Sequence, residues 1–554
     1  MAITTPTAGQ SNWDIPLNAA LNELDRRLVE ASFNATEYGA AGDGTTNDTT
    51  AIQAAINAAA ANGGGAVYLP PTASGYLLDS DALTITTSGI TLRGSGGSAT
   101  KLILGANFTG TTMVNITAAN CGVIDLWFEG ADTTPTNNPV ADAIRAVGVR
   151  RTRINRCTFF YINGWAIQLQ STTASSTSNP RGSVIDQIYL SECAGGVRFL
   201  GDTTQGFQMN CQLTNMQAAF TGVTSGASAD LDVILVEDAW DVLIDNAIAW
   251  MSNGTGSSLH VLGDCAATFV QNFDGLGSQA GPCVLIESDA GGFPQNVQIT
   301  GGVIQQGTIG LQVTGTARHI RVDTSRIINN ETHGISIENT VSPVYLTNLF
   351  FSTSGEGAAG SNYDINWSGS AEGVVDRCRF ASPITAIGVA GVQQSVNIAA
   401  AQDVTFNNVS FVGTAAASTN WFTNLPDAVL LAGDHGRYNF RTRVDFADQI
   451  ATQPSASGNT VLSANVGGAD TFDRLRILGS GQIEIGSGAA ARDTNLYRAA
   501  ANQLKTDDML ITVIGLGVGN SAAATTLGSV TDRIEVFDAA GASLGFLAVY
   551  DAIT

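Results

Sequence analysis

The sequence predicts an all-β protein built as a parallel β-helix, with a short N-terminal helix and a β-rich C-terminal region. Three observations support this prediction: a low charge content, an ordered series of turn, helix and strand signals between residues 33 and 78, and a short pattern that recurs from about residue 120. Only 13% of the 554 residues are charged and 62 are Gly, which fits neither a disordered polyelectrolyte nor a helix-rich protein. We therefore expect a compact β-rich chain.

The segment 33–78 has the order of signals that would close one end of a solenoid. It predicts a turn at 42–44, N-cap side chains at 47–50, an Ala-rich helix at 52–61, a Gly run at 63–65 that ends the helix, and a strand at 66–69. This block resembles the opening of the pectate-lyase-like parallel β-helix proteins, especially phage tailspikes and tail fibres, in which the helix caps the solenoid. The resemblance implies a right-handed parallel β-helix.

A recurring pattern, in which two apolar positions flank a polar pair, predicts the coils of the solenoid. It occurs at 123–128, 154–159, 185–190, 243–248, 299–304, 322–327, 375–380 and 406–411. The closing residues Phe128, Phe159 and Leu190 are 31 apart, and Ile304 and Ile327 are 23 apart, which is solenoid spacing. The polar pair supplies Asp125, Asn155, Asp186, Asp245, Asp323, Asp376 and Asn407. We interpret these residues as turn formers before catalytic groups, because Asn and Asp tolerate left-handed turns.

The two ends of the chain differ from the coil, which we place at 33–435. In the anchor segment 1–32, Leu17, Leu21, Leu24 and Leu28 form a seam that is too short for an isolated coiled coil, so a single amphipathic helix is the alternative. In 436–554, short strands with little core indicate chains that wrap on each other, and 486–508 resembles the C-terminal rods of phage tail fibres. An independent small β-sandwich is the alternative here. Together with the tailspike resemblance, the ends predict a homotrimer.

Charge, cysteine and histidine usage exclude several classes of function. The net charge is −23 and Lys101 and Lys505 are the only lysines, so we expect no nucleic-acid partner. No apolar run is long enough for membrane insertion. The seven cysteines contain no CxxC pair and the four histidines are far apart, which predicts buried free thiols, no metal site and no cofactor. Folding in a reducing cytosol fits these thiols.

The candidate site rests on the acidic segment 236–241. Glycoside hydrolysis needs two carboxyl groups about 5 to 9 Å apart, one of them protonated, and adjacent coils provide this separation. We predict Glu237, Asp238 and Asp241 as catalytic, because they lie outside the turn positions of the repeat. We predict substrate binding by Trp240, Trp250, Asp274, Glu287 and Asp289, the last three one coil further along. Solvated loop carboxylates are the alternative, and Arg150, Arg151, Arg153 and Arg156 are expected to form ion pairs.

The resemblance implies a phage tailspike or tail fibre that attaches to the tail or baseplate through its N-terminal segment and binds a host surface polysaccharide. Whether a depolymerase activity also cleaves that polysaccharide is left open, and a glycoside hydrolase is favoured over a lyase because no stacked aspartate cluster facing Arg can be located. The sequence is also compatible with a non-catalytic receptor-binding fibre or a structural minor tail protein. The acidic chain favours a neutral or amino-sugar polymer. Such a protein would be made in the host cytoplasm, released by lysis and located in the virion tail.

Overall fold

The computed structural model describes most of the coil and separate strands of the C-terminal region. The described residues are 32–134, 137–172, 180–201, 208–220, 231–251, 255–278, 280–338, 343–352, 363–369, 372–381, 394–398, 404–407, 409–412, 422–423, 429–432, 460–464, 474–478, 480, 482–487, 494–500, 503–505, 530–537 and 542–550. The predicted leucine seam and the segment 433–459 lie outside them.

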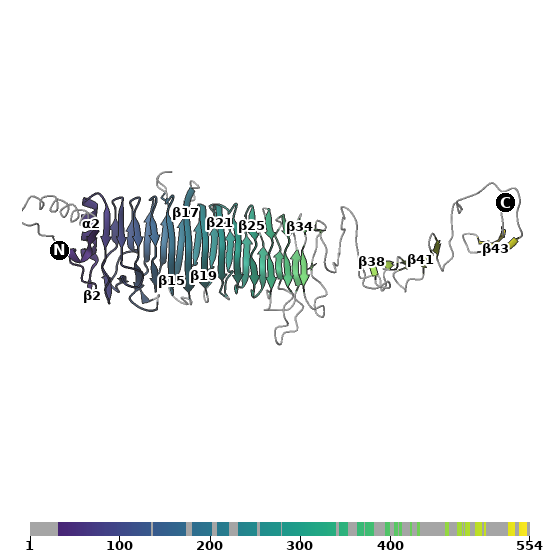
Figure 1. The fold of residues 1–554 in the computed structure, drawn as a ribbon, viewed down its shortest axis with the longest axis horizontal. Coiled ribbons are helices and arrows are strands. Elements are labelled where there is room, and N and C mark those ends of the chain that lie inside the picture. Colours follow the sequence, from purple (N-terminus) through teal and green to yellow (C-terminus); the bar gives the residue numbers. More distant parts are fainter. Residues whose placement is uncertain are drawn as a thin grey trace, which may run out of the picture. The chain divides into compact units, whose positions relative to one another are not determined.

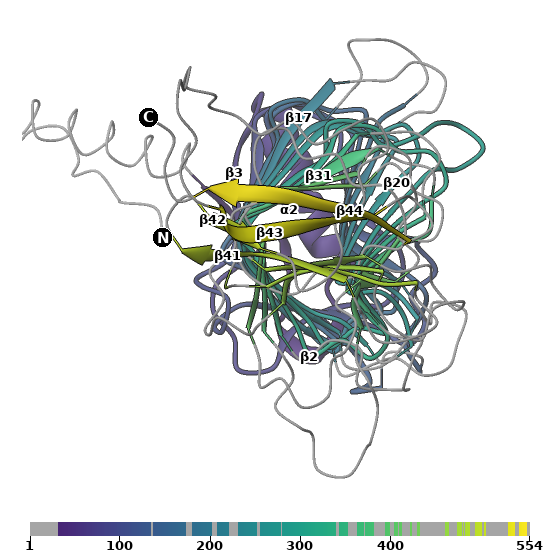
Figure 2. The same ribbon diagram turned by 90° about the vertical axis from the view of Figure 1, so that its right-hand side faces the viewer.

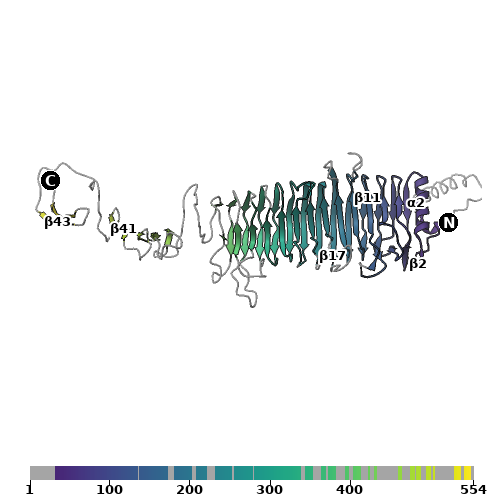
Figure 3. The ribbon, with the colours of Figure 1, turned by 180° about the vertical axis from the view of Figure 1, so that it is seen from behind.

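The coil is a right-handed parallel β-helix, as predicted, whose strands stack into two large sheets (Figures 1 and 3). One sheet has 13 strands: β5 (Leu83–Ile85), β8 (Thr112–Ile116), β11 (Asp142–Val147), β14 (Trp165–Gln170), β16 (Gly195–Leu200), β18 (Ile234–Glu237), β20 (Leu259–Leu262), β22 (Val284–Glu287), β24 (Ile309–Thr314), β27 (His333–Ile337), β30 (Tyr363–Trp367), β33 (Gln394–Ile398) and β36 (Phe422–Thr423). Each strand pairs in parallel with its equivalent on the next coil, so that side chains at the same position form rows along the axis.

The other sheet has 24 strands and contributes one long strand or two short strands from each coil. Its strands are β1 (Ser32–Asn34), β2 (Asp43–Asn47), β3 (Gly65–Tyr68), β4 (Gly75–Leu78), β6 (Ile90–Arg93), β7 (Lys101–Leu104), β9 (Gly122–Ile124), β10 (Trp127–Gly130), β12 (Arg153–Asn155), β13 (Thr158–Phe160), β15 (Val184–Ser191), β17 (Gln208–Phe220), β19 (Trp240–Met251), β21 (Ala266–Leu276), β23 (Gln298–Gln305), β25 (Ile320–Asp323), β26 (Arg326–Ile328), β28 (Val344–Thr347), β29 (Phe350–Ser352), β31 (Gly373–Asp376), β32 (Arg379–Ala381), β34 (Val404–Asn407), β35 (Ser410–Val412) and β37 (Val429–Ala432).

The two sheets enclose a narrow apolar core. The end-on view in Figure 2 shows the strands of successive coils superposed around a common axis. Inward residues repeat from coil to coil, and their rings stack when they are aromatic. Phe128 and Phe159 have centroids 5.2 Å apart, and Phe351 and Phe380 have centroids 4.8 Å apart. The core is therefore a set of parallel apolar stacks, which is why the apolar positions of the repeat were recognisable in the sequence.

The N-terminal end of the coil is closed as the entry block predicts. A 3-10 helix, η1 (Ala35–Tyr38), is followed by β2 and by helix α2 (Thr49–Ala61), which packs on β1, β3, β5 and β6. The N-terminal turn of α2 differs in detail from the prediction. The side chain of Asn47 accepts a hydrogen bond from the backbone N–H of Thr49 at 3.1 Å, whereas that of Asp48, at the N-cap position, makes no bond to the helix.

Asp48 instead holds the entry turn against the first coil. Its buried carboxylate accepts backbone N–H groups of Ala41 at 2.6 Å, Gly42 at 3.2 Å and Leu77 at 3.3 Å. Burial raises the pKa of this carboxyl group, and the same three N–H donors act against the rise. Asp48 thus joins the entry turn at 41–42 to β4 at the end of the coil.

Between the paired strands of the 24-stranded sheet, ten successive coils turn through a left-handed residue. These residues, which we call the corner row, are Asp125, Arg156, Gln187, Asn215, Asn246, Asn272, Gly301, Thr324, Asn348 and Arg377, with φ between 50° and 76°. The left-handed residue is Asp125 itself on the first coil, but on later coils it directly follows the predicted turn residue. The predicted carboxylates still serve the turn, because Asp186 accepts bonds from Asn155 at 2.9 Å and from Asn215 at 2.8 Å, on the coils before and after it.

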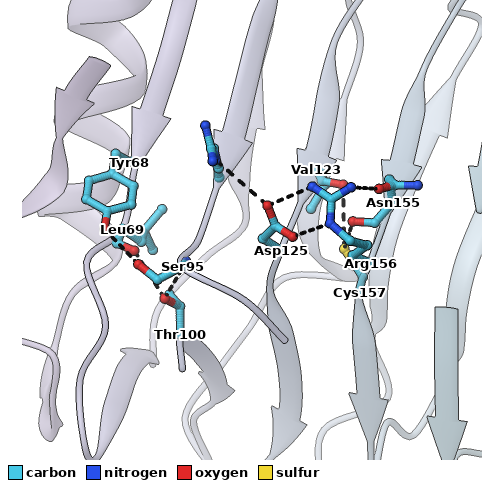
Figure 4. A network of polar contacts seen from close by, with 10 residues as sticks. Tyr68, Leu69, Ser95, Thr100, Val123, Asp125, Asn155, Arg156 and Cys157 are labelled. Carbon is cyan, nitrogen blue, oxygen red and sulfur yellow. Dashed lines mark hydrogen bonds and ion pairs between the residues drawn. The ribbon is translucent and has the colours of Figure 1, made fainter. Parts of the chain in front are cut away.

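Hydrogen bonds along the corner row occupy the carboxylates in it and beside it. Burial opposes ionisation of Asp186, yet the bonds from Asn215, Thr214 and Asn155 together lower its pKa. Figure 4 shows the first members of the row, where Arg156 binds Asp125 through Nε at 2.6 Å and Nη2 at 2.9 Å. The expected ion pair of the arginine cluster is thus confirmed for Arg156, and these carboxylates are structural.

The seven cysteines are buried free thiols, as predicted. Several lie in the core beside backbone carbonyl oxygens, such as Cys157, whose Sγ lies 3.5 Å from the carbonyl oxygen of Val123 (Figure 4). Burial raises the pKa of the Cys157, Cys193, Cys211, Cys265, Cys283 and Cys378 thiols to about 12. Thiols of this kind behave as small apolar side chains.

The chain divides into two compact units, Met1–Val444 and Asp445–Thr554. The second contains an antiparallel sheet of β38 (Thr460–Ala464), β39 (Leu475–Leu478), β40 (Ile483–Ile485), β41 (Thr494–Ala500) and β42 (Gln503–Lys505), and a hairpin of β43 (Val530–Phe537) and β44 (Ser543–Tyr550). Within the described residues of both units, no helix is long and apolar enough to span a membrane.

We expect Asp48→Asn to lower the free energy of unfolding by about 1 to 3 kcal/mol, because an amide offers a single acceptor oxygen to three backbone N–H donors. Asp43→Asn is the matched control, since Asp43 is exposed and accepts bonds from its neighbours Thr45 and Thr46 alone. Urea unfolding followed by circular dichroism measures both variants. Equal losses would contradict the role assigned to Asp48.

Candidate functional site

The outer face of the 13-stranded sheet carries polar side chains on ten successive strands, from β11 to β33. These side chains, which we call the polar row, are Arg145, Gln168, Gln170, Arg198, Glu237, His260, Glu287, Gln312, Ser336, Glu338, Asn366 and Asn397. They alternate along each strand with core residues such as Ile167, Val197 and Val261, which are fully buried. Alternation places the polar side chains on the outside.

Hydrogen bonds join neighbouring members in the first part of the polar row. Arg145 donates to the side-chain oxygen of Gln170 through Nη2 at 2.7 Å, and Gln168 donates to the same oxygen at 3.1 Å. On the following coils, Arg198 binds Glu237 through Nε at 2.9 Å and Nη2 at 2.6 Å. Both side chains of this ion pair are partly exposed, so we expect it to orient the groups more than it stabilises the fold.

The later part of the polar row is a chain of neutral groups around one carboxylate. Glu338 accepts from Gln312 at 3.1 Å and from Ser336 at 2.7 Å. Asn366 donates to Ser336 at 3.1 Å, and Asn397 donates to Asn366 at 2.7 Å. These bonds cross coil after coil, so the row is a pre-ordered set of donors and acceptors.

The middle of the row contains a buried histidine between two carboxylates. His260, on β20, has Nδ1 at 2.9 Å from Oδ2 of Asp232 and Nε2 at 3.1 Å from Oε1 of Glu287. The His260 side chain is 11% exposed and that of Glu287 is 33% exposed. Burial favours the neutral ring, but the two hydrogen bonds and the two negative charges prevail and raise the pKa of His260 to about 9.

Four of the predicted site residues meet at one corner of the coil. Glu237 ends β18 and Asp238 follows it, Glu287 ends β22 and Asp289 lies two residues beyond it, and the corresponding corner of the coil between them contains Gly263. A methyl group placed on Gly263 would collide with Oδ1 of Asp238 and lie 3.2 Å from the carboxyl carbon of Asp289. We call these four side chains the carboxyl corner.

Asp238 and Asp289 differ in their surroundings within the carboxyl corner. Asp238 is buried and accepts the backbone N–H of Asp264 at 2.8 Å. Burial is the main cause that raises the pKa of Asp238, and the negative charges of Asp289, Glu237 and Asp264 add to it. Asp289 is exposed and accepts the N–H groups of Gly291 and Gly292. A carboxyl group with raised pKa beside an exposed one is the arrangement that acid catalysis requires.

Two predicted residues near the carboxyl corner, Asp241 and Trp240, have structural contacts. Asp238 and Asp241 lie outside the corner row, as expected, but both are left-handed, with φ of 51° and 58°, and form turns of their own. Asp241 accepts a bond from Asn210 at 3.2 Å on the preceding coil. Trp240 is half-buried and donates through Nε1 to the carbonyl oxygen of Asp264 at 3.0 Å.

The remaining predicted residues, Trp250 and Asp274, lie on the 24-stranded sheet rather than with the carboxyl corner. Trp250 is 40% exposed on β19 and pairs in register with Leu276, two residues after Asp274 on β21. Burial raises the pKa of Asp274, and a bond from Gln305 acts in the opposite direction. Asp274, Glu287 and Asp289 therefore do not form one group, because the chain changes sheet between positions 274 and 287.

Sequence reasoning missed Arg198, Asp232 and His260. The available signal was spacing: Leu235, His260 and Leu285 are 25 residues apart and stand in register on β18, β20 and β22. A histidine at an outward position of an otherwise apolar strand indicates that this face of the sheet carries polar groups. In the described part of the chain, no group of three or more His, Cys, Asp or Glu side chains is arranged to hold a metal ion.

Comparison with known proteins relates the first part of the coil to polysaccharide-modifying enzymes. Residues 32–259 match the family model of rhamnogalacturonase A/epimerase, pectate lyase-like proteins. The match runs from β1 to the start of β20. Mannuronan C5-epimerase AlgE1 of Azotobacter vinelandii is 41% identical over 111 residues, which are 18% of this chain and 8% of that protein. The chain thus spans less than a tenth of that relative's length.

Solved structures with a similar course of the chain include enzymes and phage proteins. The A-module of mannuronan C-5 epimerase AlgE4 from Azotobacter vinelandii has a TM-score of 0.47 and 18% identity, over 74% of this chain and 97% of the module. Tailspike protein 3 of bacteriophage CBA120 has a TM-score of 0.46 and 12% identity, over 84% of this chain and 71% of the tailspike. With fewer than one residue in five identical, neither structure transfers a residue role to this chain.

The packing of the carboxyl corner predicts a specific cost for Gly263→Ala. The matched control is Gly89→Ala, because Gly89 has a similar φ of +81° against +75° but no atom within 4 Å of an added methyl group. Both variants bear the left-handed penalty of about 1 kcal/mol, and Gly263→Ala should lose about 1 to 3 kcal/mol more as Asp238 is displaced. Urea unfolding measures the difference, and equal losses would contradict this packing.

Proposed function

We propose that the protein binds an extended polysaccharide along the polar row. The observation that carries this proposal is that ten successive strands present a polar side chain on the same outer face, at one of two neighbouring register positions. At about 4.8 Å per strand, the row extends for about 40 Å, which suits a linear polymer better than a small molecule.

The chemistry of the row suits sugar hydroxyl groups, which donate and accept hydrogen bonds. Amides, guanidinium groups and carboxylates all occur along it, and each is held by a neighbour, as Asn366 is by Ser336 and Asn397. Because the side chains are already ordered, binding a polymer costs less conformational entropy. The family match supports this proposal, since its description names polysaccharide-modifying enzymes and its residues include Arg145, Arg198 and Glu237.

We extend the proposal to a reaction at the carboxyl corner, which adjoins the row through Glu237 and Glu287. Asp238, with its raised pKa, would act as the general acid and an ionised neighbour as its partner, as in glycoside hydrolysis. The relatives' names, which include alginate lyase 7 of Azotobacter vinelandii, add lyase and epimerase chemistry to the reactions worth assaying. Asp241 is less suited than Asp238, because the side chain of Asn210 occupies one of its oxygens.

The biological setting that we propose is adsorption of a phage to a glycan on its host. The entry block, which resembles the tailspikes, supports this setting. A purely structural tail component would not need a pre-ordered row of sugar-binding groups. A non-catalytic fibre is what remains if the row binds a glycan and the carboxyl corner is inert.

Binding is tested with three probes: alginate, a neutral β-glucan and chitosan oligosaccharides. We expect one of them to bind, and the triple variant Arg145→Gln, Gln312→Ala, Asn366→Ala to weaken it at least about tenfold, measured by isothermal titration calorimetry. Gln212→Ala is the control, because Gln212 is equally outward but lies on the 24-stranded sheet. A triple variant that binds like the native protein would place the binding surface elsewhere.

The same mixtures, analysed for shortened or epimerised products, test the reaction. Products that disappear with Asp238→Asn or Glu237→Gln but persist with Asp241→Asn would support the carboxyl corner. Binding without any product over pH 4 to 9 would support a non-catalytic adhesin.

The tail setting also predicts a homotrimer. The second unit exposes apolar side chains on its strands, with Ile485 48% exposed and Leu544 68% exposed, which neighbouring chains would cover. Light scattering should give three times 57.2 kDa for the native chain. Truncation after residue 432 should shift the mass toward the monomer while circular dichroism retains the β signal, whereas a native monomer would contradict the prediction.

A further inference from the structure

His260 occupies the one point of the polar row where a buried ring connects three coils. Asp232 precedes β18, His260 lies on β20 and Glu287 ends β22, and the ring contacts both carboxylates through its two nitrogens. Asp232 is itself fixed, because its Oδ1 accepts the backbone N–H of Ser257 at 2.7 Å. A series of hydrogen bonds therefore runs from the backbone N–H of Ser257 through Asp232 and His260 to the partly exposed Glu287.

The hydrogen-bond inventory determines the charge of the ring. An ionised carboxylate only accepts, so each of the two contacts needs an N–H on the ring, and a neutral imidazole has one. In register with His260, the strands on either side present Leu235 and Leu285, which bring no further charge. The next charged pair is Arg198 with Glu237, whose charges compensate each other.

We propose that His260 is an imidazolium at neutral pH and a positioning residue, which holds Glu287 as an ionised hydrogen-bond acceptor for the bound glycan. The positioning role rests on the proposed polysaccharide-binding function, whereas the charge of the ring does not. One oxygen of Glu287 contacts His260, and the Glu287 side chain is 33% exposed. Glu287 is then unsuited to be a general acid, which leaves that role to Asp238.

His333 shows that this charge is not a general property of the sheet. It lies on β27 in the same sheet, stacks on Tyr363 with centroids 5.5 Å apart, and accepts the backbone N–H of Tyr363 on Nδ1 at 3.2 Å. An accepting nitrogen carries no proton, and burial lowers the pKa of His333. At pH 7, His260 should therefore be positively charged and His333 neutral.

The linkage of this charge to stability has a defined direction. The pKa of His260 is about 9 in the folded chain and about 6.5 in the unfolded chain. Its stabilising effect is thus complete below pH 6.5 and is lost as the pH rises toward and through 9. The unfolding midpoint of the native protein should fall over this interval.

Nitrogen-15 NMR of histidine-labelled full-length protein tests the charge directly, because the chain has four histidines and His260→Gln and His333→Gln assign two of them. We expect His260 to be protonated on both nitrogens at pH 7 and to titrate near pH 9, and His333 to be neutral. Glu287→Gln should move the titration of His260 down by at least one pH unit. A His260 with a single proton at pH 7, or a titration that ignores Glu287→Gln, would overturn the proposal.

Glycan affinity separates positioning from mere stabilisation. With the probe that binds the native protein, affinity should fall about tenfold between pH 7 and pH 10 at a temperature where the protein stays folded. Glu287→Gln should bind at least about fivefold more weakly at pH 7 and lose this pH dependence, while His333→Gln keeps both. Unchanged affinity in Glu287→Gln would overturn the positioning role. A protonated His260 in a protein that binds no probe would refute the polysaccharide function and the positioning role with it, but not the charge.

Discussion

Parallel, in-register pairing of every coil with the next is the constraint on which the rest of the molecule depends. It brings equivalent positions to about 4.8 Å from each other along the whole axis. Whatever one coil places at a position, its neighbours must accept, so inward positions become stacks such as Phe128 on Phe159 and outward positions become rows. The apolar core, the corner row and the polar row are three consequences of the same pairing.

This constraint also explains why two rows rich in polar groups have different roles. Beside the corner row, carboxylates such as Asp186 are occupied by donors from the coils on both sides, which lowers the pKa and leaves little free hydrogen-bonding capacity. At the carboxyl corner, burial and like charges act on Asp238 with a single backbone donor against them. Only the second arrangement leaves a carboxyl group with free hydrogen-bonding capacity.

The coil was predictable from the sequence because its signals are local. Apolar positions three to five residues apart around a polar pair define a turn wherever they occur, and the entry block contains its own turn, helix and strand. The fine use of Asp48 was not predictable, since its partner Leu77 is 29 residues away. On the 13-stranded sheet, Leu235, His260 and Leu285 recur every 25 residues, but Asp232 lies 28 residues from His260, so this contact could not be read from the spacing.

Of the predicted site, Glu237 and Asp238 are adjacent in sequence, and Glu287 and Asp289 lie at the same corner with one coil, that of Gly263, between them. Asp274 and Trp250 were assigned to the same site by sequence distance alone, and the change of sheet between positions 274 and 287 separates them. Sequence distance in a solenoid reports the coil but not the face of the coil. The contacts of His260 with Asp232 and Glu287 need residues that lie both on successive coils and on the same face.

The buried thiols have a consequence for where the protein can work. A thiol with a pKa of about 12 has roughly one part in 100,000 as thiolate at pH 7, and the thiolate is the species that oxidants and disulfides attack. The Cys157 sulfur is also enclosed by neighbouring coils. A chain assembled under reducing conditions could therefore enter an oxidising medium without forming or exchanging disulfides, and its covalent structure would be the same on both sides of that passage.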